Sequence, residues 1–429
     1  MKDLKNIIVV IVSIVICIFL VELTSYLILK YNSRLHFEKP YFSREICPYY
    51  VFKNTPGYTS KSIKKNDSEK DIVIDSYGFI SNCDLSKPKG VKTFRIFLTG
   101  GSAAYGNGQS DPYERVKKYA GGVYSFESSI AGQIELILNN TYPEFHFEVV
   151  NACASGRQIH QSIGLYLSVI KDLSPDVVIS MDGMNDLATI NGISPYSDIP
   201  VDVFSKYLEL YQINENFQEK SFSQMINLIK AIHFSNVTNK LMTHEKSKQD
   251  RLMNYDRKNY TAIKYREYKN EMSAHCNVFT DLILYYHTLC QLKDVTFIFC
   301  LQPLLNREIN KVLTPTEQRL QQLVNPINIS LGVSNIPDST IIRYEEMGNY
   351  TLKFFIDDYL SKEIDTLSGD YGFEYIDFNR AIENKYAESD FYTDYCHLTF
   401  EANKIIAEIL SERIGMVLFR NKNELTPDK

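Results

Sequence analysis

Residues 95–101 read RIFLTGG, a short run of aromatic, aliphatic and β-branched side chains that stops at two glycines. Such a run predicts a buried strand followed by a tight turn. Residues 126–138 then carry apolar side chains at spacings of three and four, which predicts an amphipathic helix. A strand, a turn and a helix in this order form the first unit of an α/β fold.

The same alternation continues along the chain. Four further strand-like segments follow, at Phe147–Val150, Asp176–Ser180, Val295–Leu301 and Phe373–Phe378. A helix is predicted for about residues 158–172, and Thr399 is placed to cap a final helix with Phe400 and Leu410 in its apolar stripe. This rhythm predicts a parallel sheet with helices on both faces, and such sheets bind ligands at the carboxyl ends of their strands.

An apolar stretch runs from Ile7 to Leu29, and Glu22 is its one charged residue. At about 1.5 Å per residue it reaches roughly 34 Å, enough to cross a hydrocarbon core of about 30 Å. No small-x-small cleavage motif follows it, so a membrane anchor is favoured over a cleaved signal peptide. Basic residues on the two sides of the stretch are nearly balanced, so the positive-inside rule favours neither orientation. The usual orientation of a signal anchor is therefore expected by default, with a short cytoplasmic tail at residues 1–6.

Three regions are expected after this anchor at residues 7–29: a juxtamembrane arm at 30–91, an α/β domain at 92–412 with polar insertions at about 190–290 and 304–370, and a C-terminal tail at 413–429. Hydrophobic residues make up 44% and charged residues 23% of the 429 residues, which excludes a largely disordered chain. The net charge of −6 has the wrong sign for a nucleic-acid surface, so no nucleic-acid partner is expected.

Eight cysteines are scattered along the chain without a C-x-x-C pair, so neither a zinc site nor a thioredoxin-like site is expected. A disulfide between Cys47 and Cys83 is conceivable if the domain is exported. Unpaired thiols are the favoured reading, because cysteine density is low.

Three polar or small residues follow the first three predicted strands. Ser102 follows the first, where a tight turn can expose its hydroxyl; a helix N-cap or phosphate-loop serine is the alternative. Gly156 follows the second and lets its N–H approach a ligand closely, although in isolation a turn glycine explains it better. Asn185, within Gly183-Met-Asn-Asp186 after the third strand, carries an amide donor suited to an oxyanion hole.

A fourth signal, Asp394-Tyr-Cys-His397, lies just before the last predicted helix. Its spacing lets a carboxylate orient one imidazole nitrogen while the other faces a serine as a base. A bare D-x-x-H occurs by chance about once in a chain of this length, so the pattern alone does not indicate a catalytic pair. Its position in a loop before the last predicted helix makes it a candidate. His160 is a further candidate to line the cleft, although packing or surface roles are favoured for it and the remaining histidines.

Taken together, the order Ser, Gly, G-x-N-D and D-x-x-H resembles the SGNH hydrolase superfamily, also called GDSL esterases and lipases. The matching residues are Ser102, Gly156, Asn185 and His397, with Asp394 as the triad acid. The resemblance covers about residues 92–190 and 291–412. Its first block departs from the family, with Gly-Gly-Ser-Ala in place of the usual Gly-Asp-Ser-Leu, and Cys153 replaces a common glycine in the second. The resemblance implies a flavodoxin-like three-layer α/β/α sandwich with a five-stranded parallel sheet.

The resemblance also implies acyl-ester chemistry without a metal or organic cofactor. Ser102 would attack a carbonyl carbon, His397 would move the proton, and Asp394 would hold the imidazole. The N–H groups of Ser102 and Gly156 and the amide of Asn185 would bind the oxyanion.

A narrower resemblance is to membrane-anchored bacterial members encoded with surface-polysaccharide genes. It rests on the apolar N-terminus, on Asp75-Ser-Tyr-Gly-Phe79 and on the segment Phe297–Pro303. It implies a single-pass membrane protein with an extracytoplasmic serine esterase that removes O-acyl groups, acetyl first of all, from a cell-envelope glycan. An O-acyltransferase on the same glycan and a non-catalytic envelope-assembly protein are the alternatives. A lipase is disfavoured because the insertion at 190–290 is polar.

Overall fold

The computed structural model describes residues 2–31, 44–47, 49–63, 70–108, 122–188, 223, 225–226, 229, 262–305, 312–323, 360–382, 389–394 and 396–419. The chain divides into two compact units, which are described separately. The first comprises Met1–Ile46 and Pro200–Tyr265, and the second comprises Cys47–Ile199 and Arg266–Lys429. The predicted insertions therefore lie largely outside the described residues, as do residues 420–429 of the predicted tail.

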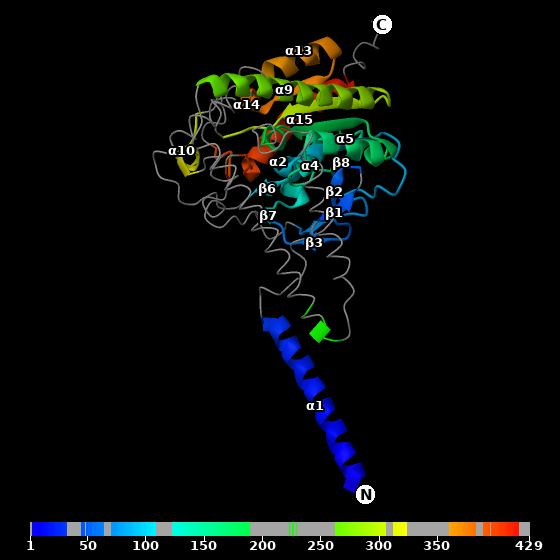
Figure 1. Cartoon of the computed structure of the whole chain (residues 1–429). Coiled ribbons are helices and arrows are strands. Elements are labelled where there is room, and N and C mark those ends of the chain that lie inside the picture. The colour runs from blue at the N-terminus through cyan, green and yellow to red at the C-terminus, as the bar shows by residue number, and fades with distance from the viewer. Residues whose placement is uncertain are drawn as a thin grey trace. The chain divides into compact units, whose positions relative to one another are not determined.

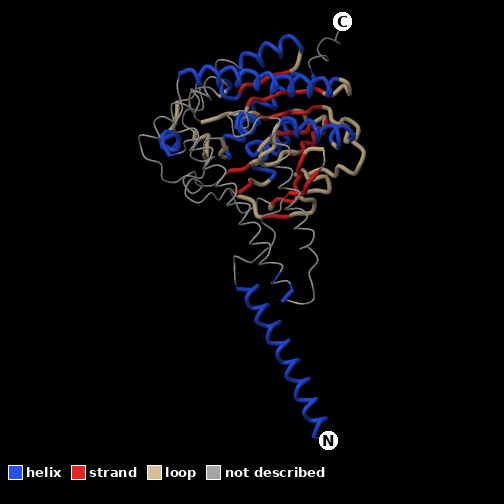
Figure 2. The backbone as a smooth tube through the Cα atoms, in the orientation of Figure 1, coloured by secondary structure: helices blue, strands red, loops and turns tan. Residues whose placement is uncertain are grey.

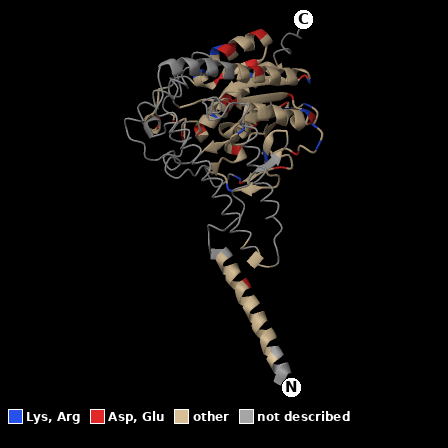
Figure 3. Cartoon of the chain, in the orientation of Figure 1, with Lys and Arg blue, Asp and Glu red and all other residues tan. Residues whose placement is uncertain are grey.

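The first unit contains the long apolar helix α1 (Lys2–Tyr31) and most of strand β1 (Arg44–Cys47). Within α1, Val9–Ile28 has a mean hydropathy of 2.5 and is 6% buried. Within Val9–Ile28, Glu22 is the one charged residue (Figure 3). Glu22 accepts hydrogen bonds from the Ser223 hydroxyl and the Met225 N–H. By length and composition α1 can cross a membrane, a description that a signal sequence also meets.

A five-stranded parallel sheet forms the centre of the second unit (Figures 1 and 2). Its strands are β5 (Thr93–Gly100), β8 (His146–Asn151), β9 (Val177–Asp182), β10 (Thr296–Leu301) and β11 (Glu374–Asp377). They lie in the order β11-β10-β9-β5-β8, and every neighbouring pair is parallel. This is the flavodoxin-like order 2-1-3-4-5. The five predicted strands and the predicted three-layer fold are confirmed.

Helices cover both faces of the sheet, which explains why its strands are largely apolar. Successive side chains of β5 alternate between the two cores: Ile96 and Leu98 belong to one and Phe97 to the other. The first core is closed by α4 (Ile130–Thr141) and α15 (Phe400–Phe419). The second is closed by α5 (Ile159–Ser168), α9 (Ala262–Gln291) and α13 (Ser361–Tyr371), of which α9 and α13 are stacked in Figure 1.

The segment before β5 contributes side chains to both cores. It contains β2 (Val51–Asn54), β3 (Thr59–Ser60) and β4 (Ile72–Val73). Ile72 and Ile80 pack in the core beneath α4, whereas Phe79 packs in the core beneath α5. Ile80 also exchanges backbone hydrogen bonds with Asn151 at the end of β8. Most of the region expected as an arm is therefore built into the sheet unit.

The remaining elements are short, apart from one helix of nine residues. They are α2 (Ser102–Tyr105), β6 (Asn107–Gly108), β7 (Gly122–Val123), η2 (Phe126–Ser128), η3 (Ile170–Asp172), α6 (Met184–Ala188), α10 (Pro315–Leu323) and α14 (Phe378–Ala381). The predicted helix at 158–172 is α5 followed by η3. The final helix begins after Thr399, whose Oγ1 accepts the N–H of Ala402 as predicted for a cap, and it continues beyond residue 412.

Candidate active site

The turn after β5 carries Ser102. Gly100 has φ +146°, and a Cβ there would lie 2.2 Å from the carbonyl oxygen of Met181 on the neighbouring strand, so only glycine fits this close approach. Ser102 then begins α2 at the carboxyl end of the central strands, and its side chain is half-buried. This is the edge of a parallel sheet at which ligands bind.

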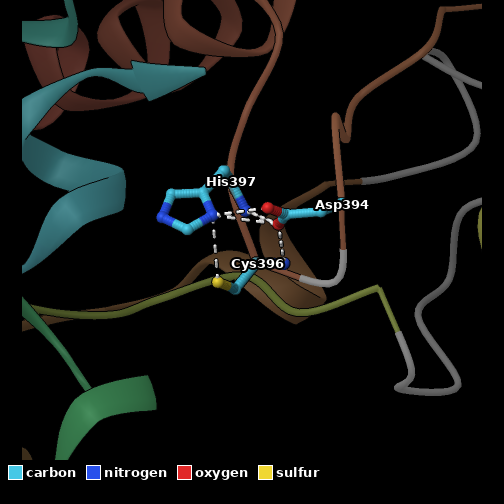
Figure 4. Close-up of side chains that lie close together, drawn as sticks. All are labelled: Asp394, Cys396 and His397. Carbon is cyan, nitrogen blue, oxygen red and sulfur yellow. Dashed lines mark hydrogen bonds and ion pairs between the residues drawn. The ribbon is translucent and has the colours of Figure 1, made fainter. Parts of the chain in front are cut away.

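Asp394 and His397 are held together by a tight loop before α15. Nδ1 of His397 lies 2.7 Å from Oδ2 and 3.0 Å from Oδ1 of Asp394 (Figure 4). Oδ1 also accepts the backbone N–H groups of Cys396, at 2.9 Å, and of His397, at 2.8 Å. The carboxylate is therefore fixed by its own loop, and both side chains are buried.

Nε2 of His397 lies 2.7 Å from Oγ of Ser102, although 295 positions separate the two residues in the chain. With the carboxylate of Asp394 on Nδ1, this contact assigns the ring proton to Nδ1 and leaves Nε2 as the acceptor toward the hydroxyl. The structure thus brings Ser102, His397 and Asp394 into one continuous line of hydrogen bonds. Such a line can withdraw a proton from a hydroxyl and stabilise the imidazolium that results.

Asn185 and the Gly156 turn meet beside Gly101. Nδ2 of Asn185 donates a 2.8 Å hydrogen bond to the carbonyl oxygen of Arg157. A Cβ on Gly101 would lie 2.3 Å from that Nδ2 and 3.3 Å from that oxygen. Gly156 is exposed and has φ +78°, a left-handed conformation that favours glycine. The three segments predicted to supply oxyanion donors are therefore adjacent at the carboxyl edge of the sheet.

Beneath this edge lie two buried charged groups that the sequence analysis did not identify. The guanidinium of Arg157 donates to the carbonyl oxygen of Ala152 and lies 5.8 Å from the centre of the Tyr50 ring. Asp182, at the end of β9, accepts a 2.6 Å hydrogen bond from the Ser180 hydroxyl. Burial raises the pKa of Asp182 to about 6, and the hydroxyl and the positive charge of Arg157 oppose that rise.

Two further contacts fix Asn185 and α5. Gln158 donates from Nε2 to the backbone oxygen of Asn185 at 3.0 Å, and Asp186 accepts the N–H of Ile159 at 3.1 Å. The loop after β9 is thereby tied to the N-terminus of α5. His160 lies in the first turn of α5, and burial lowers its pKa to about 4, so it is neutral near pH 7. Its contribution to a cleft stays a prediction.

The loop that carries Asp394 and His397 is supported by two residues that were also missed. Gln302, directly after β10, donates from Nε2 to the backbone oxygen of Cys396 at 3.2 Å. Glu317 accepts the N–H of Phe391 on one carboxylate oxygen, at 2.7 Å, and that of Thr314 on the other, at 2.9 Å. Thr314-Pro-Thr-Glu317 is a capping box, so the sequence contained a signal for the contact between Glu317 and Thr314. It contained none for the contact with Phe391.

All eight cysteines lie within the described residues, and none is joined in a disulfide, including Cys47 and Cys83. Burial raises the pKa of the Cys83 thiol to about 11. Asp394, Cys396 and His397 form a group whose ligand atoms all lie within 4.8 Å of one another, which is compact enough to hold a metal ion. No metal site was expected from the sequence.

No family model matches the chain, and no curated protein matches it. Several solved structures match the chain. A GDSL-like lipase from Bacteroides thetaiotaomicron has 10% identity and a TM-score of 0.31, over 77% of this chain and 91% of that one. An acetylxylan esterase from Geobacillus stearothermophilus has 11% identity and a TM-score of 0.35, over 75% and 94%. A second acetyl xylan esterase has 12% identity and a TM-score of 0.32, over 75% and 100%. The solved structures that the chain matches thus include a GDSL-like lipase and acetyl xylan esterases.

Proposed function

We propose that this protein is a serine ester hydrolase of the SGNH type. The observation that carries the proposal is the continuous contact from Asp394 Oδ2 to His397 Nδ1, at 2.7 Å, and from His397 Nε2 to Ser102 Oγ, at 2.7 Å. Its position at the carboxyl edge of a 2-1-3-4-5 sheet supports it. The sequence blocks around these residues support it independently of the geometry.

In the proposed mechanism, Ser102 Oγ attacks the carbonyl carbon of an ester as His397 Nε2 takes its proton. The negative oxygen of the tetrahedral intermediate receives hydrogen bonds from the N–H groups of Ser102 and Gly156 and from the Asn185 amide. His397 then returns the proton to the leaving alcohol, which leaves an acyl group on Ser102. His397 then deprotonates a water molecule, which attacks the acyl group on Ser102. The carboxylic acid leaves, and His397 returns the proton to the Ser102 hydroxyl.

We propose as substrate the O-acyl groups of a cell-envelope glycan, with acetyl as the first choice. The support is the resemblance carried by Asp75–Phe79 and Phe297–Pro303, together with the apolar helix α1. In this proposal residues 7–29 anchor the chain in a membrane, and residues 92–412 form the catalytic domain outside the cytoplasm. An acyltransferase would use the same residues, with a sugar hydroxyl in place of water.

The proposal is tested with the full chain in detergent and p-nitrophenyl acetate. Wild type should release p-nitrophenol slowly, and Ser102→Ala should abolish the release. Ser168→Ala is the matched control, because the Ser168 hydroxyl bonds only within its own helix turn in the contacts described, to the oxygens of Gly164 and Leu165. A fluorophosphonate probe followed by peptide mapping should label Ser102.

Undiminished turnover in Ser102→Ala would refute the mechanism. Labelling of Ser102 without any turnover would support an activated serine that requires a selective acceptor, as an acyltransferase does. Absence of both labelling and turnover would favour a non-catalytic protein.

A further inference from the structure

Cys396 has no part in the proposed mechanism, yet its thiol lies against the imidazole. Its Sγ is 3.5 Å from Nδ1 of His397, and the residue is 2% exposed. Figure 4 shows the thiol and the carboxylate of Asp394 both directed at this same ring nitrogen. An oxygen, a sulfur and a nitrogen, each of a type that binds metal ions, therefore lie within 4.8 Å of one another.

The spacing of these atoms suits a tetrahedral zinc ion. Zinc binds thiolate sulfur at about 2.3 Å and imidazole nitrogen at about 2.0–2.1 Å, which places the two ligand atoms about 3.5 Å apart. The separation here is 3.5 Å. The oxygen Oδ2 of Asp394, at 2.7 Å from Nδ1, would move away by roughly half an ångström to reach tetrahedral geometry. Oδ1 would keep its two backbone N–H donors.

We propose that Oδ2 of Asp394, Sγ of Cys396 and Nδ1 of His397 form a binding site for Zn²⁺, and that the bound ion switches off the esterase. A set of one sulfur, one nitrogen and one oxygen favours a borderline-soft ion over Mg²⁺ or Ca²⁺, which prefer oxygen alone. Water or an external ligand would complete the fourth position. The inhibitory half of this inference rests on the proposed function, whereas the binding half does not.

Inhibition follows from where the imidazole proton must go. A neutral imidazole carries one ring proton, which the hydrogen bond to Asp394 holds on Nδ1. When Nδ1 gives its lone pair to the metal, the ring proton resides on Nε2 instead. Nε2 would then face Ser102 Oγ as a donor, and it would no longer accept the hydroxyl proton. Ser102 would lose its base without any movement of its own.

The charges and protons of the bound state balance. Cys396 binds as a thiolate and releases its proton to solvent, while the imidazole keeps its single proton on the other nitrogen. The thiolate and the Asp394 carboxylate together supply two negative charges against the two positive charges of Zn²⁺. The occupied cluster is therefore neutral overall, as a buried site requires.

The binding half is tested with Co²⁺, which takes zinc sites and reports its ligands by absorption. The full chain in detergent should show tetrahedral Co²⁺ bands and a thiolate-to-cobalt charge-transfer band, and Ser102→Ala should show the same spectrum. Cys396→Ala and Cys396→Ser should both lose the charge-transfer band. Cys83→Ala, which removes another partly buried thiol, should keep it. A wild-type spectrum without that band would overturn the site.

The inhibitory half is tested by fluorophosphonate labelling of Ser102. Zn²⁺ should stop labelling in wild type, a chelator should restore it, and Mg²⁺ should have no effect. In Cys396→Ala the Zn²⁺ concentration for half-inhibition should rise by more than about 100-fold, because a direct ligand is lost and outer contacts alone account for 10–100-fold. Binding without loss of labelling would overturn the inhibition. If the Co²⁺ charge-transfer band appears but the probe never labels Ser102, the metal site is supported and the proposed function is refuted.

Discussion

A Cβ on Gly101 would lie 2.3 Å from Nδ2 of Asn185, closer than side-chain carbons approach a nitrogen. The same amide donates to the carbonyl oxygen of Arg157 at 2.8 Å. The absence of a side chain before Ser102 is therefore what lets the amide of Asn185 lie beside the proposed nucleophile. Backbone conformation does not demand this glycine, since its φ is −82°.

Gly101→Ala should therefore displace Asn185 and lower kcat for p-nitrophenyl acetate by about 100-fold, the usual cost of one lost oxyanion donor. KM should change little, because the donor acts in the transition state. Gly369→Ala is the control, as a Cβ there meets nothing within 4 Å. A wild-type kcat in Gly101→Ala would contradict the placement of Asn185.

Asn185→Ala should lower kcat by on the order of 100-fold for the same reason. Because both substitutions remove one donor, the double variant Gly101→Ala/Asn185→Ala should be no slower than either single variant. Steady-state kinetics of the four proteins give this comparison. Multiplicative losses would mean that Gly101 acts on catalysis by a different route.

Asp394→Asn should lower kcat by about 10⁴-fold, since an amide cannot hold the imidazole proton on Nδ1. Its remaining carbonyl oxygen can still accept the N–H groups of Cys396 and His397, so the loop should persist. Thermal melting of the variant checks the fold separately from activity. If activity survives Asp394→Asn, another group orients His397.

Asp182 should make stability depend on pH. Its pKa is raised from 3.8 to about 6, so between these values the folded state binds more protons than the unfolded state. Its contribution to the free energy of unfolding should therefore fall as pH rises from about 4 to about 6, and then level off. Urea unfolding across this range should show no such pH dependence of the free energy of unfolding in Asp182→Asn. The exposed Asp172→Asn should retain it.

Glu317→Gln should destabilise the protein by about 1–3 kcal/mol, because one of two buried N–H groups loses its acceptor. Phe391 leads directly into the Asp394 loop, so kcat should fall as well. Denaturant midpoints and kcat are measured together, with Glu408→Gln on the exposed side of α15 as control. Unchanged stability would contradict a need for both carboxylate oxygens as acceptors.

Most of the sheet could be predicted from sequence because the strands are short, largely apolar runs between turn signals. Burial on both faces makes such runs continuous, and β9 is buried at every position. The segment before β5 was harder to interpret. Its strands β3 and β4 have two residues each, and the burial of Ile72 and Ile80 comes from partners far along the chain. A local pattern therefore suggested an arm.

The catalytic residues of the candidate site could be predicted from sequence, but the residues that hold their loop in place could not. Asp394 and His397 are three positions apart, so their contact follows from spacing, and the resemblance alone predicted that Ser102 lies beside them. Gln302 acts across 94 positions and Glu317 across 74, through a backbone oxygen and a backbone N–H. Any residue type offers those backbone groups, so no motif records such contacts. Arg157 looked like an ordinary charged residue until the structure placed it in the core.

Helix α15 begins three residues after His397 and packs against α4 beneath the sheet. A ribosome releases the chain N-terminus first, so the hydroxyl of Ser102 exists throughout the synthesis of the following 295 positions without its imidazole. A nascent or truncated chain that ends before His397 contains no base for the serine. In the proposed mechanism a chain that has not yet reached His397 is therefore inactive, and the serine gains its base only with the loop that precedes α15.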